Sequence, residues 1–428
     1  MSRGRLGILV GGGPAPGING VIAAATIEGI NQGYEVIGFY DGFKWLAAGE
    51  AQHCKPLAIR DVSGIHLRGG SILGTSRTNP TKSETSMQNV FKVLEQLGIT
   101  TLVTIGGDDT AFSASQVAKR SNGKIHVAHV PKTIDNDLPL PGSTPTFGFE
   151  TARHYGVQLV RNLMEDARTT SRWYIIISMG RAAGHLALGI GKASAATLSI
   201  ISEEFHGRQV TVDEVCDIII GSIIKRRADG SENGIVILAE GLIEAMGEQG
   251  LIKALPDGQL ERFGKVLRDD HGHLRLGEIE FGRLMKELLN QRLEKLGLKM
   301  TFIDKDLGYE LRCADPIPFD AEYTRDLGYA AVKFLLSPEA GKYGAIISFV
   351  NGAMNPLPFD QMLDPKTGRM QNRKVNVDGE AFECACAYMI RLEREDFENA
   401  KQLAKLAAVV KQTPEQFKSR FGYLVGLK

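Results

Sequence analysis

Short apolar runs alternate with helix-length stretches along most of the chain. The first run, Leu6–Val10, is followed by a glycine turn and by the alanine- and isoleucine-rich stretch Ile18–Ile30. Further apolar runs predict strands at Glu35–Tyr40, at Thr101–Ile105 with a helix after it, and at Lys124–Val130. Strands that alternate with helices in this way are typical of a parallel, doubly wound sheet.

The same alternation predicts a second α/β lobe from about residue 150. Its expected elements are a helix at 150–168, a strand at 173–178, a helix at 182–192, a strand at 198–202, a helix at 212–227, a strand at 235–238, a helix at 322–336 and a strand at 344–350. The polar stretch 247–297, with an amphipathic helix at 281–296, is interpreted as an insertion, and a charged helical tail is expected at 382–408. The expected fold class is α/β, with two doubly wound parallel-sheet lobes, a helical insertion and a helical C-terminal tail.

Composition excludes several classes of protein. The 428 residues include 50 basic and 50 acidic ones, so no net charge attracts the whole protein to nucleic acid or to an anionic membrane. No apolar run reaches the roughly 18 residues that a membrane span needs. Five scattered cysteines fit a reducing compartment, and the first residues lack the pattern of a signal peptide. We therefore expect a cytoplasmic location.

Residues that could take part in catalysis or ligand binding lie where the predicted strands end, which is where open parallel sheets bind ligands. The segments are Gly11–Gly13, Gly106–Asp109, Lys132–Asp137, Met179–Arg181 and Glu240. The first of them leads into a helix, so its backbone N–H groups can bind a phosphate, although glycine there can also serve packing alone. It matches neither a Walker A loop nor the dinucleotide fingerprint.

Two acidic segments indicate phosphoryl transfer. Asp108 and Asp109 follow Gly-Gly, where a carboxylate can bind Mg²⁺; the alternative is that they cap the next helix. The segment Lys132–Asp137 combines a cation, a hydroxyl and two carboxylates, enough to position a phosphoryl group and deprotonate an alcohol. Asp135 is the best candidate for the base, against the alternative of a simple Asx turn.

Two arginines flank one predicted strand. Arg172 precedes it and Arg181 follows it, so the two guanidinium groups emerge at opposite ends and do not share one phosphate within one chain. If both are functional, one of them serves a neighbouring subunit.

His271 and His273 lie in the polar insertion without a closed set of metal ligands, and we interpret them as surface residues.

Taken together, these segments resemble the phosphofructokinase family, and within it the pyrophosphate-dependent branch. The matching motifs are spread over about residues 5–355. The resemblance implies reversible phosphorylation of fructose 6-phosphate at its C1 hydroxyl, in glycolysis or gluconeogenesis. It implies that 1–149 is the lobe for pyrophosphate and Mg²⁺ and that 150–355 is the sugar-phosphate lobe. The rest of the chain, 356–428, lies outside the resemblance and is expected to be a C-terminal extension that returns to pack on the lobes.

The resemblance also implies a role for each matching residue. Asp135 would accept the proton, Asp108 would bind Mg²⁺, and Thr133 and Asp137 would frame the transferred phosphoryl group, whose charge Arg181 would stabilise. The residues implied to hold the sugar phosphate are Met179, Gly180, Arg181, Glu240, Tyr309 and Arg312, and Gly13 matches the turn for the donor phosphate. Arg172 would reach the site of an adjoining subunit, which implies a homo-oligomer, a dimer or a tetramer.

Two residues bear on the phosphoryl donor. Family members that use ATP carry glycine at the place of Asp109 and generally lack Lys132. A carboxylate there repels the α-phosphate of a nucleotide and fills its volume, whereas Lys132 neutralises pyrophosphate. Three alternatives stay open: an ATP-dependent or mixed-donor kinase, additional action on sedoheptulose 7-phosphate, and a non-catalytic regulatory subunit. The second arises because Ile303 and Tyr309 stand where allosteric bacterial enzymes have arginine and histidine.

Overall fold

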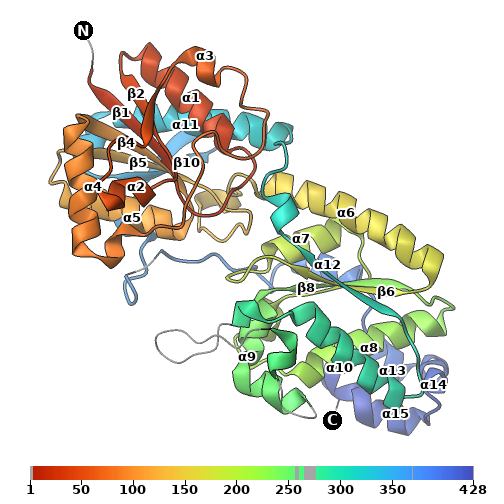
Figure 1. Ribbon diagram of the computed structural model, residues 1–428. Helices are drawn as coiled ribbons and strands as arrows, with labels where there is room; N and C mark the ends of the chain where they lie inside the picture. Colours follow the sequence, from red (N-terminus) through yellow and green to blue (C-terminus); the bar gives the residue numbers. More distant parts are fainter. Residues whose placement is uncertain (1–2, 256–259, 265–275, 369, 428) are drawn as a thin grey trace. The chain divides into compact units, whose positions relative to one another are not determined.

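The chain divides into two compact units. The computed structural model describes all residues except 1–2, 256–259, 265–275, 369 and 428 (Figure 1). Unit 1 consists of Met1–Tyr155 and Tyr309–Arg373, and unit 2 of Gly156–Gly308 and Lys374–Lys428. The chain therefore passes from one unit to the other three times, and neither unit is a continuous stretch of sequence.

Unit 1 is built on a seven-stranded sheet in the order β11-β10-β5-β4-β1-β2-β3. The strands are β1 (Arg5–Val10), β2 (Glu35–Phe39), β3 (Cys54–Leu57), β4 (Ile99–Gly106), β5 (His126–Pro131), β10 (Ala345–Val350) and β11 (Ala353–Pro358). The five central strands are parallel, whereas β3 and β11 pair antiparallel at the two edges. This is the doubly wound sheet that the strand–helix alternation predicts.

Helices cover both faces of this sheet, as a parallel sheet requires (Figure 1). One face carries α1 (Ile18–Asn31), α3 (Ile59–Val62) and α11 (Pro318–Leu335), and the other α2 (Lys44–Ala48), α4 (Glu84–Gln96) and α5 (Asp108–Arg120). Successive residues of β1 point to opposite faces, so Ile8 and Leu9 are both fully buried, one in each core. Burial on both faces explains why the strands read as continuous apolar runs.

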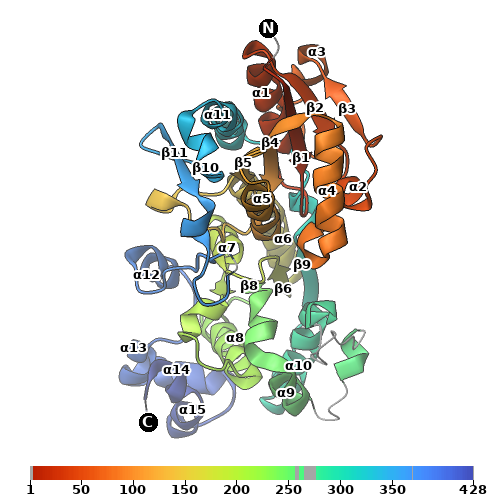
Figure 2. The same cartoon turned by 90° about the vertical axis from the view of Figure 1, so that its left-hand side faces the viewer.

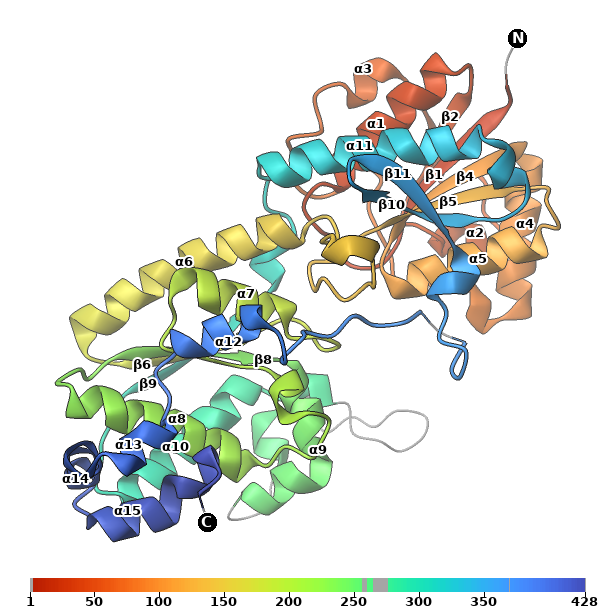
Figure 3. The same ribbon diagram turned by 180° about the vertical axis from the view of Figure 1, so that it is seen from behind.

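Unit 2 contains a smaller parallel sheet in the order β7-β8-β6-β9. The strands are β6 (Trp173–Ser178), β7 (Leu198–Ile200), β8 (Gly234–Ala239) and β9 (Phe302–Leu307). The helices are α6 (Phe149–Thr170, which begins in unit 1), α7 (His185–Ser194), α8 (Val212–Ala228), α9 (Gly241–Ala254) and α10 (Phe281–Lys295). Figure 3 shows α6 and α7 on one side of this sheet and α8 and α10 on the other.

Short 3-10 helices complete the two units. Those of unit 1 are η1 (Pro80–Lys82), η2 (Pro141–Ser143), η6 (Tyr309–Leu311), η7 (Pro338–Gly341) and η8 (Phe359–Met362). Those of unit 2 are η3 (Ser202–Phe205), η4 (Leu260–Phe263), η5 (Leu276–Glu278) and η9 (Gly422–Val425). Among the described residues, no helix has both the length and the apolar character that crossing a membrane requires.

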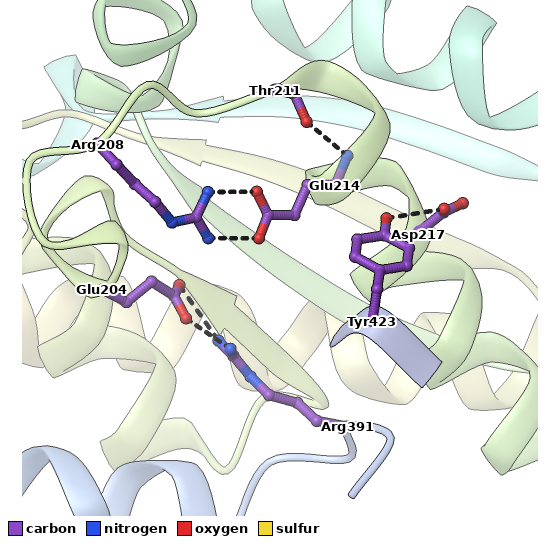
Figure 4. A network of polar contacts seen from close by, with 7 residues as sticks. All are labelled: Glu204, Arg208, Thr211, Glu214, Asp217, Arg391 and Tyr423. Carbon is purple, nitrogen blue, oxygen red and sulfur yellow. Dashed lines mark hydrogen bonds and ion pairs between the residues drawn. The ribbon is translucent and has the colours of Figure 1, made fainter. Parts of the chain in front are cut away.

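The C-terminal tail is part of the core of unit 2. Its helices are α12 (Glu380–Ala387), α13 (Arg394–Glu398), α14 (Ala400–Val409) and α15 (Pro414–Phe421), and Figure 2 shows the last three beside α8. Leu406, Phe417 and Phe421 are fully buried in the same cluster as residues of α8. Figure 4 shows two polar contacts of the tail: Arg391 donates to Glu204 over 2.6 Å, and Tyr423 donates to Asp217 over 2.9 Å.

One expectation about the organisation is wrong. The helix at 322–336 and the strand at 344–350, expected in the second lobe, are α11 and β10 of unit 1, because β10 pairs with β5 and α11 packs against α1. Within the segment 247–297, which was interpreted as an insertion, Leu284 and Leu288 of α10 are fully buried in the core of unit 2. His271 and His273 lie outside the described residues.

The division of the chain also differs from the expected boundaries at 149 and 355. The structure returns residues 309–373 to unit 1 and assigns only the part from Lys374 onward to unit 2. Strand β9 escaped the sequence reasoning because Phe302–Leu307 contains three charged residues. It tolerates them as an edge strand that pairs with β6 alone.

Asp320 connects residues 309–373, the second stretch of unit 1, to the first stretch of that unit. Its fully buried carboxylate accepts hydrogen bonds from Gly148 N at 2.8 Å, from Thr151 N at 2.8 Å and from Thr151 Oγ1 at 2.6 Å. Asp320→Ala leaves three buried donors without their acceptor, so we expect a loss of about 3 kcal/mol in the free energy of unfolding. Asp326→Ala, at an exposed position of the same helix, should stay within about 0.5 kcal/mol of the wild type. Equal thermal midpoints for the two variants would contradict this role of Asp320.

Candidate active site

The glycine turn after β1 is held from two directions. Gly11 N donates to Ile105 O at 2.8 Å, and Gly12 N donates to Ser76 O at 2.8 Å. A β-carbon at Gly11 would lie 2.4 Å from Thr110 Oγ1, so this close approach requires glycine. Gly12 has a φ of 82°, in the left-handed region that glycine enters without strain. The turn is thus a fixed backbone surface at the carboxyl end of β1.

Basic side chains surround this turn. Lys132, only 4% exposed, follows β5, and its ammonium group donates to Gly13 O. The guanidinium of Arg312 lies beside the same turn, since a β-carbon at Gly13 would be 3.5 Å from Arg312 Cζ. The pKa of Lys132 falls to about 8, chiefly because of burial; the charges of Asp135 and Asp137 raise this pKa, and those of Arg312 and Arg77 lower it. Three cations and a glycine turn form a site suited to a polyphosphate anion.

The paired acids open helix α5. Its N-cap is Gly107, so Asp108 and Asp109 occupy the first turn, where a negative charge interacts favourably with the helix dipole. Both side chains are exposed at the carboxyl end of β4. A β-carbon at Gly106 would lie 2.3 Å from Thr110 Cβ, which explains the glycine before them. The two interpretations of these acids, as residues that cap helix α5 and as residues that bind a metal ion, are therefore compatible.

The segment after β5 forms a tight turn. Thr133 Oγ1 accepts a hydrogen bond from Asp135 N at 3.0 Å, and Thr133 also hydrogen-bonds the carboxylate of Asp137. Burial raises the pKa of Asp137, and the negative charge of Asp108 raises it further. Since β4 and β5 are neighbouring parallel strands, their ends bring these two acids close together. The described residues contain no group of three or more His, Cys, Asp or Glu side chains that could hold a metal ion.

Unit 2 gathers a second set of the predicted residues at the carboxyl end of β6. Gly180 N donates to Glu240 Oε2 at 3.3 Å, and Arg181 Nε lies 3.9 Å from Glu240 Oε1. The side chain of Arg181 is 61% exposed. Met179 lies against Gly308, where a β-carbon would come within 2.7 Å of Met179 Cε. The set presents an exposed guanidinium and a carboxylate side by side, which suits a phosphorylated polyol.

Arg172 lies at the other end of β6, as expected. Its Nε is 3.9 Å from Asp166 Oδ2, and six strand residues separate it from Met179. At ~3.3 Å per strand residue this is a separation of about 20 Å. Within unit 2, Arg172 and Arg181 therefore do not act on one group.

Tyr309 and Arg312 belong to unit 1 and not to the lobe in which they were expected. Arg312 Cζ lies 4.7 Å from the centre of the Tyr309 ring, and that ring is 76% exposed. Because Arg312 contacts the glycine turn, it belongs with Lys132 among the cations of unit 1. The sequence near Arg312 did not indicate this position, because nothing in it shows that the chain returns to unit 1 at Tyr309.

Sequence reasoning missed two arginines near the predicted residues. Arg77 follows Ser76, which binds the glycine turn, and the charge of Arg77 acts on Lys132. Arg373 donates from Nε to Asn136 O at 3.1 Å, within the turn after β5. Arg77 could have been found as a basic residue after a Gly-Thr-Ser segment. Arg373 had no such signal, because its contacts join residues more than 200 positions apart in the sequence.

The chain was compared with protein families and with known proteins, and two of its similar relatives have the same name. Residues 5–335 match the family described as phosphofructokinase. The chain is 53% identical over 423 residues to a pyrophosphate–fructose 6-phosphate 1-phosphotransferase of Thermotoga maritima, covering 99% of both chains. It is 51% identical over 428 residues to a protein of the same name from Naegleria fowleri, covering 98% of this chain and 95% of that one.

Solved structures agree on the fold. The pyrophosphate-dependent phosphofructokinase of Marinobacter aquaeolei superimposes with a TM-score of 0.64 at 17% identity, covering 95% of this chain and 91% of that one. At this identity the likeness concerns the fold alone. With two parallel-sheet units, the ordered glycine and acid segments at their strand ends, and a family match over most of its length, the chain belongs to the phosphofructokinase family.

Proposed function

We propose that the chain is a pyrophosphate-dependent 6-phosphofructokinase. It transfers a phosphoryl group from pyrophosphate to the C1 hydroxyl of fructose 6-phosphate, giving fructose 1,6-bisphosphate and phosphate, and the reaction runs in both directions. The observation that carries the proposal is the buried Lys132 on the glycine turn, combined with Asp109 at the start of α5. Relatives that are half identical over nearly the whole chain and bear this activity in their names support it.

Unit 1 supplies the donor site and the base. Gly13, Lys132 and Arg312 hold the pyrophosphate through backbone N–H groups and positive charge. Asp135 accepts the proton of the attacking hydroxyl, while Thr133 fixes the turn through Asp135 N and, with Asp137, frames the reacting phosphoryl group. Most of the barrier reduction in such transfers comes from positioning and charge stabilisation, which these residues provide.

Unit 2 supplies the acceptor site. Arg181 and Glu240, with Met179 and Gly180, hold the sugar phosphate, and Arg181 also stabilises the charge that develops during transfer. Tyr309, a residue of unit 1, keeps its expected role toward the sugar phosphate in this proposal, whereas Arg312 is assigned to the pyrophosphate. All of these residues are present, so we do not favour a non-catalytic regulatory subunit.

The acids at the ends of β4 and β5 fit a magnesium ion. Mg²⁺ is usually bound by one or two carboxylates together with water and substrate phosphates. Asp108 would hold it, with Asp137 close enough that the charge of Asp108 raises the pKa of Asp137. When bound, the ion neutralises negative charge on the phosphate chain.

We further propose a cytoplasmic homo-oligomer in which Arg172 reaches the site of a neighbouring subunit. All five cysteines are free thiols, which suits a reducing compartment. Arg172 lies at the end of β6 that is remote from Arg181. Light scattering tests the assembly, and a monomer with full activity would contradict it.

The donor is tested by Asp109→Gly. Removing the carboxylate opens the volume that the α-phosphate of a nucleotide needs, so we expect the ratio of kcat/KM for ATP to kcat/KM for pyrophosphate to rise at least about tenfold. Asp109→Asn is the matched control, because it removes the charge and keeps the volume. Wild-type turnover that is faster with ATP than with pyrophosphate at the same Mg²⁺ concentration would contradict the proposed donor.

Lys132 predicts a pH dependence of the affinity for pyrophosphate. Its pKa of about 8 means that the ammonium is charged below that pH and loses its charge above it. The carboxylates of Asp135 and Asp137 favour the charged form, whereas Arg312 and Arg77 disfavour it. We therefore expect kcat/KM for pyrophosphate to fall as the pH rises through about 8.

Lys132→Arg is the control for this pH profile. A guanidinium stays charged over this range, so the alkaline fall should move to higher pH, while the ionisation of pyrophosphate itself is the same for both proteins. Identical alkaline limbs in the wild type and in Lys132→Arg would rule out Lys132 as the titrating group.

A further inference from the structure

The segment Arg373–Val375 joins the two units and contacts a loop of the candidate site in each. Arg373 is the last residue of unit 1, and Lys374 is the first residue of the part of unit 2 that follows. Both lie beyond residue 335, where the family match ends. The inference rests on the proposed function, because it concerns how that site is held.

In unit 1, Arg373 forms hydrogen bonds with the turn that contains the proposed base. Its Nε donates to Asn136 O at 3.1 Å, one terminal nitrogen donates to Asn136 Oδ1, and the other donates to Thr144 O at 3.0 Å. Its backbone N donates to Asp137 O at 2.5 Å. The planar guanidinium thus uses all of its nitrogens on the turn and on Thr144, the residue that follows η2.

The residue that Arg373 contacts has a left-handed backbone conformation. Asn136 has a φ of 55°, in a region that asparagine enters more readily than other L-residues but that most L-residues avoid. It stands between Asp135 and Asp137, so its backbone angles set the direction of both carboxylates. Asn136 Oδ1 also accepts from Thr146 N at 3.1 Å, which anchors the same side chain a second time. Arg373 therefore helps to stabilise a backbone conformation on which the proposed chemistry depends.

In unit 2, the next two residues hold the loop that carries Arg181. Lys374 Nζ donates to Ala182 O, and Val375 N donates to Glu203 Oε1 at 3.3 Å. The same Glu203 oxygen accepts from Gly184 N at 2.8 Å. Glu203 thus connects the joining segment to the end of the loop. The loop is also closely packed, because a β-carbon at Gly184 would lie 2.6 Å from Ile201 Cβ.

We propose that Arg373–Val375 positions one loop of candidate site residues in each unit: Arg373 sets the turn of unit 1 that bears Asp135 and Asp137, and Lys374 and Val375, through Glu203, set the loop of unit 2 that bears Arg181. None of these residues needs to touch a substrate. They act through the groups that do.

Arg373→Lys tests the first half of the proposal. Lysine keeps the charge but cannot make the forked contacts, so we expect kcat to fall about 10- to 100-fold, with each KM changed less than about threefold. Guanidinium ions added to Arg373→Ala should restore part of the kcat. Arg391→Lys is the matched control, because this guanidinium also belongs to the tail. It donates to Glu204 (Figure 4) and to Ser199 O. It should lower the melting temperature and leave kcat unchanged.

Glu203→Ala tests the second half, with the adjacent Glu204→Ala as its control. We expect Glu203→Ala to raise the KM for fructose 6-phosphate about tenfold and to leave the KM for pyrophosphate unchanged, because the donor residues belong to unit 1. Glu204 pairs with Arg391, so its loss should affect stability alone. Equal effects of the two substitutions on the sugar-phosphate KM, or an unchanged kcat in Arg373→Lys, would overturn the proposal.

Hydrogen exchange separates this inference from the proposed function. The peptide that contains residues 133–137 should exchange faster in Arg373→Lys than in the wild type, and the peptide that contains residues 180–184 should do so in Glu203→Ala. Turnover of fructose 6-phosphate with pyrophosphate by the wild type tests the function itself. Unchanged exchange in both variants would reject the positioning role whatever the substrate.

Discussion

The contact between the Lys132 ammonium and the Gly13 carbonyl unites the donor half of the site. It joins the end of β5 to the end of β1, although β4 lies between these strands in the sheet. Burying an ammonium group is costly unless hydrogen bonds and opposite charges compensate, and here a carbonyl and the nearby carboxylates do so. The compensation is incomplete, so the pKa of Lys132 falls to about 8. A donor site built on this lysine has a charge that pyrophosphate itself helps to stabilise.

Sequence reasoning predicted the segments at the strand ends better than it predicted which elements pair with one another. The segments after β1, β4, β5 and β6 could be predicted because a strand and the turn after it are local, and their glycines and acids stand next to one another in the chain. Arg373, by contrast, acts on Asn136 from 237 positions away. Strand β10 gave a clear apolar signal, yet nothing in its composition says that it pairs with β5. Local patterns specify elements, whereas their partners depend on the whole fold.

The division of the site residues follows the chain's return to unit 1. Arg312 was expected with the sugar-phosphate residues, yet it lies beside the glycine turn after β1, because residues from Tyr309 onward rejoin the first sheet. Strand β9 was missed for a related reason. It contains charged residues that a central strand would exclude, so the apolar pattern of the sequence did not predict it. In both cases the missing information was which sheet, and which edge of it, a segment joins.

The three passages between the units have a consequence for how the protein folds as it is synthesised. All four strands of the second sheet leave the ribosome before α11, β10 and β11 of the first sheet. Until then α1 lacks its principal helical partner, and its apolar side chains remain uncovered. A fragment that ends near residue 155 would expose this surface permanently. The N-terminal unit is therefore first in the gene, yet it is completed only at residue 373, after every strand of the second sheet has been synthesised.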